Sequence, residues 1–158
     1  MELRAVALLI LFLLSASVDS AQDLIAVSNL RRKSPTAGLC ACVIEPSGFL
    51  CSEHTTQTKD GYLLGLQRVS SPSVRVRQRG SPVLLIHGLF MAGDAWFMDS
   101  PNQSLGFILA NHGFDVWVGN VRGTFWSHGH MSLSEKDKDF WDWSWQELAF
   151  YDLGEMIR

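Results

Sequence analysis

The sequence has little net charge and few cysteines, and each shortage argues against a class of function. Its 158 residues include 13 Lys and Arg and 16 Asp and Glu, which gives a formal charge of −3 at pH 7. A chain with so little charge has no bulk attraction to nucleic acid, so we expect no such partner. Its three cysteines, with no fourth ligand nearby, make a poor zinc site. We therefore predict no metal site and no cofactor.

Long apolar runs are also scarce, and the longest lies at the beginning of the chain. Residues 5–14 are apolar, Arg4 precedes them and small residues follow. This order predicts a secretory signal peptide over residues 1–20, cleaved after Ser20. The competing interpretation, an uncleaved membrane anchor, is less favoured because the run is short for a spanning helix and has the wrong flanking residues. We therefore expect a secreted protein whose residues 21–39 form a polar, basic N-terminal arm.

Secretion has two covalent consequences, because an oxidising compartment favours disulfides and the secretory route adds glycans. Cys40 and Cys42 are too close in sequence for an unstrained bridge, so one of them is expected to pair with Cys51, with one thiol left over. Residues 40–56 are then predicted to form a short cross-linked loop. Asn102 begins an Asn-Gln-Ser triplet, which is a candidate N-glycosylation site.

The middle of the chain predicts a parallel sheet. Residues 82–87 form an apolar run typical of a strand covered on both faces, residues 104–112 have apolar side chains at helical spacing, and residues 114–118 form a second strand. This order is a βαβ unit, whose two strands are parallel. Upstream lie a strand at residues 61–69, entered from an Asp-Gly turn, and a polar turn with a basic stretch at residues 74–79. The predicted fold class is therefore α/β.

The last part of the chain begins with a polar, Trp-rich loop and ends in a helix. Ser144 and Glu147 form a capping box that opens this helix, and Asp152 interrupts its apolar stripe. Arg122 and Gly123 follow the second strand of the βαβ unit. We interpret Arg122 as a structural residue that binds carbonyls or a carboxylate in the turn.

One loop suggests catalysis, because His87, Gly88 and Leu89 directly follow the first strand of the βαβ unit. In α/β-hydrolases the loop at this position supplies one N–H of the oxyanion hole, which stabilises the charge that develops on an ester oxygen. The glycine lets the backbone approach the substrate and the next residue donates. We therefore predict the backbone N–H of Leu89 as a donor and its side chain as incidental.

A nucleophile is missing from the sequence. The motif Gly-x-Ser-x-Gly, which presents a catalytic serine on a sharp turn, does not occur in the 158 residues, so no catalytic residue is assigned. Ser127, His128 and His130 suggest a catalytic or metal site, but two histidines without a third ligand are more often polar loop residues. A hydrolase that uses Ser127 is the least favoured hypothesis, because it lacks an elbow and a buried base.

Several segments match a known family. They are HGLFMAGDAWFMD, NQSLGFILANHGFDVWVGNVRGTFWSHGHMSL and FWDWSWQELAFYDLGEMI, with GLC…GFLCSEHTTQTKDGYLLGLQRV upstream. They resemble the acid lipase family, which includes gastric and lysosomal lipases of animals and secreted triacylglycerol lipases of plants, and the upstream segment is similar to the plant branch. The resemblance covers about residues 37–158. It implies a partial α/β-hydrolase fold, hydrolysis of neutral-lipid esters by a Ser-Asp-His triad, and an extracellular or vacuolar-lysosomal location.

The resemblance also carries over to single residues. It implies that Leu89 is the oxyanion-hole donor and that Cys40 and Cys51 form the disulfide of the plant members. It also implies that Asn120, Arg122 and Gly123 belong to the structural loop that the family has after this strand. Cys42 is then a departure from the family pattern. The serine motif, the lid, and the Asp and His of the family are expected after Arg158.

The leading hypothesis is that residues 40–158 are the N-terminal part of an α/β-hydrolase lipase domain, truncated before the nucleophile elbow and inactive alone. The expected partners are a lipid ester substrate and the surface of a membrane or lipid droplet. The alternative is a non-catalytic, secreted short form that binds lipid or a partner through its Trp-rich loop.

Overall fold

The computed structural model describes residues 38–73 and 80–158. The predicted signal peptide, most of the predicted N-terminal arm and the basic stretch at residues 74–79 lie outside the described residues. Within the described ranges, no helix is long and apolar enough to cross a membrane.

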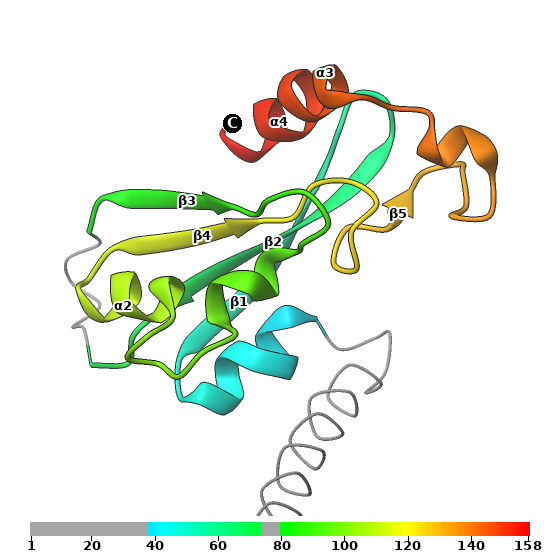
Figure 1. The fold of residues 1–158 in the computed structure, drawn as a ribbon. Helices are drawn as coiled ribbons and strands as arrows, with labels where there is room; N and C mark the ends of the chain where they lie inside the picture. Colours follow the sequence, from blue (N-terminus) through cyan, green and yellow to red (C-terminus); the bar gives the residue numbers. More distant parts are fainter. Residues whose placement is uncertain (1–37, 74–79) are drawn as a thin grey trace, which may run out of the picture. The chain divides into compact units, whose positions relative to one another are not determined.

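A mixed sheet forms the centre of the described part (Figure 1). Its strands run in the order β1-β2-β4-β3, and a short β5 pairs with the start of β2. The β3–β4 pair is parallel and the other pairs are antiparallel. The parallel pair of the predicted βαβ unit is therefore confirmed. The strand bounds are Leu50–Gln57 (β1), Tyr62–Ser70 (β2), Pro82–Ile86 (β3), Asp115–Gly119 (β4) and Gly129–His130 (β5).

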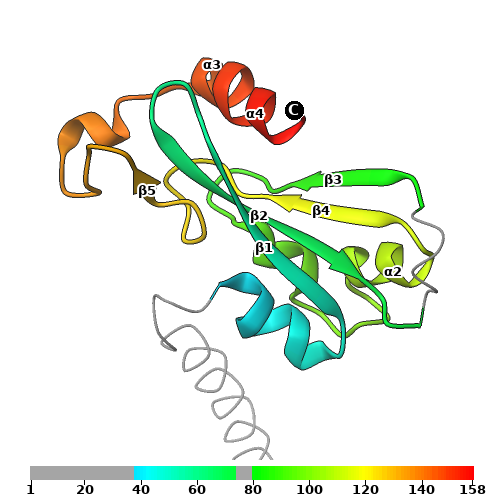
Figure 2. The ribbon, with the colours of Figure 1, turned by 180° about the vertical axis from the view of Figure 1, so that it is seen from behind.

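One face of the sheet is covered by α2 (Leu105–Asn111) and by short helical turns at Cys40–Ile44, Glu45–Ser47 and Gly93–Phe97 (Figures 1 and 2). The helix that the apolar spacing predicts at residues 104–112 is thus present. Because side chains alternate across a strand, every second residue of β2 and β4 faces this layer. The buried core here comprises Leu39, Ile44, Phe49, Val69, Leu85, Phe97, Phe107, Ala110, Val116 and Val118.

The opposite face is covered by the last helical segment (Figures 1 and 2). It consists of α3 (Trp145–Glu147), a π-helical stretch (Leu148–Leu153) and α4 (Gly154–Met156), and follows a turn at Lys138–Trp141. The predicted capping box is present: the Ser144 N–H donates to Glu147 at 2.7 Å, and the Ser144 hydroxyl accepts from the backbone of Gln146. A second core forms here from Tyr62, Leu64, Leu66 and Phe140, flanked by Trp117, Leu133, Trp143 and Met156.

The prediction that residues 40–56 form a loop is wrong. These residues form helical turns and the strand β1, which pairs with β2 along its whole length from Leu50 to Gln57. Six of the eight β1 residues are exposed, so β1 has no apolar periodicity to reveal it. Its conformation follows from pairing with the more apolar β2, not from its own sequence.

A disulfide joins Cys40 in the first turn to Cys51 in β1, and Cys42 lies outside it. Glu53 of β1 adds a second tie, because its carboxylate accepts the Cys40 N–H at 2.7 Å. The disulfide and this hydrogen bond fix the first turn against the outer strand.

The expectation that residues 82–87 are covered on both faces is also wrong for most of β3. Only Leu85 is buried, and Pro82 is exposed. The reason is position: β3 pairs with β4 alone within the described residues, so it is an edge strand of the sheet. A parallel strand is fully covered only when it lies inside a sheet layered on both faces.

Replacing Cys40 and Cys51 together with alanine is expected to lower the free energy of unfolding by about 3 kcal/mol, because the bridge restricts the unfolded chain across this short loop. Equilibrium denaturation in urea measures the loss. Cys42→Ala is the matched control and should cost clearly less. An equal loss in both variants would contradict a stabilising role for the disulfide.

Candidate functional site

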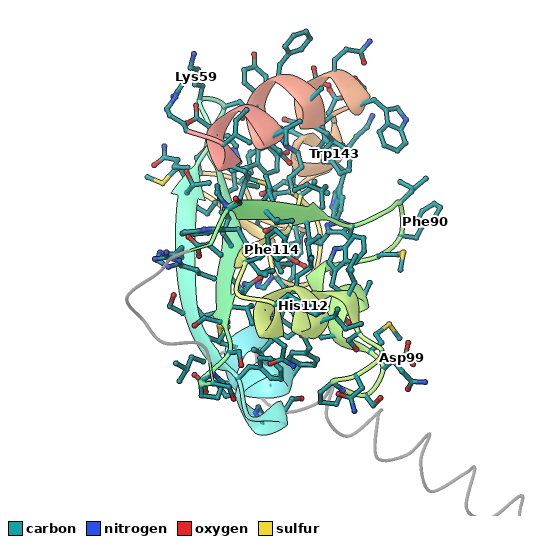
Figure 3. All side chains as sticks on the ribbon, turned by 90° about the vertical axis from the view of Figure 1, so that its left-hand side faces the viewer. Lys59, Phe90, Asp99, His112, Phe114 and Trp143 are labelled. Atoms are coloured by element: carbon teal, nitrogen blue, oxygen red, sulfur yellow. A yellow bond between two sulfur atoms is a disulfide. The ribbon has the colours of Figure 1, made fainter. Side chains whose placement is uncertain are left out.

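The loop after β3 exposes apolar side chains at the carboxyl ends of the parallel strands. Leu89 is 57% and Phe90 98% exposed, and Met91 beside them is exposed too. Figure 3 shows Phe90 projecting outward from this loop. Phe90 has a φ of 61°, a left-handed conformation that is rare for a bulky residue and marks backbone strain. The structure therefore presents this loop to solvent in an unusual backbone conformation.

The predicted donor, the N–H of Leu89, lies in this loop. Within the described ranges, no backbone or side-chain acceptor takes that N–H in a hydrogen bond. The neighbouring Gly88 carbonyl is engaged instead: it accepts the Met91 N–H at 3.2 Å and lies 2.9 Å from Nδ1 of His87. The peptide N–H of Leu89 is thus available to a ligand oxygen.

The loop after β4 holds this candidate loop through Asn120, which is completely buried. Its side-chain oxygen accepts the Gly93 N–H at 2.7 Å. Its amide nitrogen donates to the Gly65 carbonyl at 3.1 Å and to the Gln67 side chain at 2.8 Å. The family resemblance implied a structural role for Asn120, but the sequence named no partner for its side chain. The available signal was a polar residue directly after an apolar strand, since buried amides need partners.

Arg122 is buried in a cluster with two carboxylates. Its backbone N–H and its Nε each donate to Asp152 at 2.8 Å, and its terminal nitrogens bind Asp60 in the turn between β1 and β2. Asp152 is completely buried, and the guanidinium carbon lies 3.9 Å from the ring centroid of Tyr62. The interpretation of Arg122 as a structural residue that binds a carboxylate is confirmed. Asp152, which interrupts the helix stripe, is one of its partners.

Burial and pairing act against each other in this cluster. Burial by itself would raise the pKa of Asp60, but hydrogen bonds from Arg122 and Thr58 hold that pKa below its usual value. Burial raises the pKa of Asp152 despite its hydrogen bonds from Arg122. Burial would lower the pKa of Arg122, yet its bonds to both carboxylates raise it. Arg122 therefore remains charged, and the cluster acts as a structural tie between three segments.

Ser127, His128 and His130 do not form a catalytic group. The Ser127 hydroxyl is buried; it donates to the carbonyl of Asn120 and accepts the Gly65 N–H, both at 2.7 Å. The ring nitrogens of His128 and His130 bind backbone groups. The described residues contain no group of three His, Cys, Asp or Glu side chains that could hold a metal. The interpretation as polar loop residues agrees with the positions of Ser127 and His128. It is wrong for His130, which lies in strand β5 opposite Tyr62.

Arg122→Met is expected to reduce the free energy of unfolding by about 3–5 kcal/mol, because it leaves Asp152 buried without its counter-charge. Thermal and urea denaturation measure the loss. Arg68→Met is the control: Arg68 forms a partly exposed pair with Asp115 and should cost about 1 kcal/mol or less. If the two variants lose equal stability, the buried cluster is not the dominant tie.

Comparison with known proteins places the chain among lipases. The family described as partial alpha/beta-hydrolase lipase region matches residues 40–100. The chain is 60% identical to triacylglycerol lipase 1 of Arabidopsis thaliana over 96% of this chain and 37% of that protein. It is 39% identical to triacylglycerol lipase 2 of the same plant, over 80% of this chain and 31% of that protein. It is 44% identical to lipase member M of Homo sapiens, over 73% of this chain and 28% of that protein.

The chain spans about a third of the length of these curated relatives. The family match at residues 40–100 includes the disulfide, the strands β1 to β3 and the candidate donor Leu89. The mixed sheet with its parallel β3–β4 pair agrees with a partial α/β-hydrolase fold. The matched region, the relatives and the fold show that the chain belongs to the lipase family of α/β-hydrolases.

Proposed function

We propose that this chain supplies the oxyanion-hole side of a secreted lipase that hydrolyses carboxylic esters of neutral lipids by Ser-His-Asp acyl transfer. One observation carries the proposal: the N–H of Leu89 has no hydrogen-bond acceptor within the described residues and follows the edge strand of the parallel pair. An N–H fixed at this place in an α/β-hydrolase stabilises the tetrahedral oxyanion. The triad then belongs to parts of the longer protein that the length of the relatives indicates.

The surface around Leu89 supports a lipid ester as substrate. An exposed apolar segment is formed by the consecutive residues Leu89, Phe90 and Met91. Such a segment favours binding of an apolar substrate over a hydrophilic one. Acyl chains, or the surface of a membrane or lipid droplet, would remove this area from water. The proposal therefore includes contact between residues 89–91 and lipid.

Two features support a secreted protein that is extracellular or enters the vacuolar-lysosomal lumen. The Cys40–Cys51 disulfide is stable in an oxidising compartment. Asn102, the candidate glycosylation site, is exposed in a turn before α2, where an oligosaccharide meets no steric obstacle from the core. These features accompany the proposed signal peptide at residues 1–20 and the proposed lipase-domain segment at residues 40–158.

The 158-residue chain by itself is expected to hydrolyse p-nitrophenyl butyrate no faster than a buffer control. The reason is that its best-placed hydroxyl, on Ser127, is buried and engaged by two backbone groups. Release of p-nitrophenol, followed by absorbance, measures the rate. A rate above the control that disappears in Ser127→Ala would show that this chain has its own nucleophile and would refute the assignment.

In the protein expressed from the full reading frame, Leu89→Pro is expected to lower kcat by about 10²–10³-fold, because proline removes the backbone N–H. Leu89→Ala is the matched control, since it shortens the side chain and keeps the N–H. It should retain kcat within a few-fold, with matching thermal midpoints in both variants.

Tributyrin hydrolysis followed in a pH-stat gives kcat and KM for each variant. Equal kcat values for the two variants would contradict an oxyanion role for the Leu89 N–H. A full-length protein that binds triglyceride emulsions without hydrolysing them would instead support the non-catalytic alternative.

A further inference from the structure

His87 makes two hydrogen bonds that require the same form of its ring. The Val121 backbone N–H lies 3.2 Å from Nε2, and a backbone N–H can only donate. Nε2 must therefore carry a lone pair. Nδ1 lies 2.9 Å from the Gly88 carbonyl, which can only accept, so Nδ1 must carry the proton. The two contacts agree on one species, the neutral imidazole with its proton on Nδ1.

The second of these bonds acts on the peptide unit that contains the candidate donor. The Gly88 carbonyl and the Leu89 N–H belong to one planar, trans peptide group, so their directions are opposite and fixed to each other. A donor that holds the Gly88 oxygen therefore also sets where the Leu89 N–H points. The Met91 N–H, at 3.2 Å from the same oxygen, supports this orientation from the other side of the turn.

The loop that carries this peptide is tied to the loop after β4 at both of its ends. At its start, Val121 binds the His87 ring. At its end, the Gly93 N–H donates to the Asn120 side chain at 2.7 Å. A Cβ at Gly93 would lie 2.8 Å from that side-chain oxygen, so the approach requires glycine. Next to Val121, Arg122 is fixed in the buried ion cluster, so the support is rigid.

We propose that His87 is a positioning residue of the oxyanion hole, which, as the Nδ1–H tautomer, orients the Gly88–Leu89 peptide and fastens it to Val121. The inference deepens the proposed function and rests on it. His87 itself touches no reacting atom; it acts through the direction of the Leu89 N–H. Loss of its Nδ1–H donor should therefore weaken binding of the tetrahedral state more than binding of the ester.

The tautomer is tested first in the 158-residue chain, where no catalysis is needed. Long-range nitrogen–proton correlation spectra at neutral pH should show His87 protonated at Nδ1 and unprotonated at Nε2. The Val121 amide should exchange slowly with solvent and become fast in His87→Leu. Protonation at Nε2, or a Val121 amide that exchanges equally in both proteins, would overturn the inference.

The catalytic consequence is tested in the protein from the full reading frame with a graded pair of variants. His87→Leu should lower kcat on tributyrin by about 10²-fold at nearly constant KM, and weaken a boronic acid inhibitor by a similar factor. His87→Asn, whose amide NH₂ can still reach the Gly88 carbonyl, should recover most of this loss. His128→Leu is the matched control, since the exposed ring of His128 lies 2.7 Å from the Phe125 carbonyl, outside the candidate loop.

The possible outcomes separate the two claims. Wild-type-like kcat in His87→Leu, or equal losses in the Leu and Asn variants, would refute the positioning role while leaving the lipase assignment intact. No hydrolysis by the wild-type full-length protein would refute the proposed function, whatever the tautomer of His87.

Discussion

The arrangement of this chain depends on the buried ion pairs that the guanidinium of Arg122 forms with two carboxylates. It joins three segments that are distant in sequence: Asp60 in the turn between β1 and β2, the loop after β4, and Asp152 in the last helix. Removing charges from water costs several kcal/mol per ion, so the cluster is tolerable only when every partner is in place. Displacement of any one segment would leave a buried charge without its partner. The cluster therefore selects one arrangement among those that hydrophobic burial alone would permit.

The position of the candidate oxyanion loop depends on this cluster. Arg122 fixes the backbone of its neighbour Val121, which binds His87, and Asn120 on the other side holds Gly93. Asn120 is in turn held by Gln67, whose amide donates to Glu53. A line of polar groups, buried at Asn120 and Gln67 and exposed at Glu53, therefore crosses the sheet to the first turn. Preorganised donors act in catalysis because they need no rearrangement when charge develops. The loop after β3 can thus be exposed and strained at Phe90 while its two ends, His87 and Gly93, are held in place.

Local patterns in the sequence predict the parts of the fold that short stretches determine. The apolar runs and the helical spacing identify the βαβ unit, and the capping box identifies the last helix. The position after β3 makes Leu89 the candidate donor, which stays a prediction. No local pattern in the sequence predicts the contacts between residues that are distant in the chain. Strand β1 forms because β2 pairs with it, and Asp60 and Asp152 meet Arg122 only in the folded chain. A single Asp in an apolar stripe could indicate a buried ion pair, but its partner follows only from the topology.

We propose that these residues are the oxyanion side of a lipase whose nucleophile lies elsewhere in a longer protein. The most direct test is to read the transcript from its source through the codon of Arg158 to the true stop codon. We expect the reading frame to continue into a further strand followed by Gly-x-Ser-x-Gly. A stop codon directly after Arg158 in abundant message would contradict it, because the product would then be a non-catalytic relative.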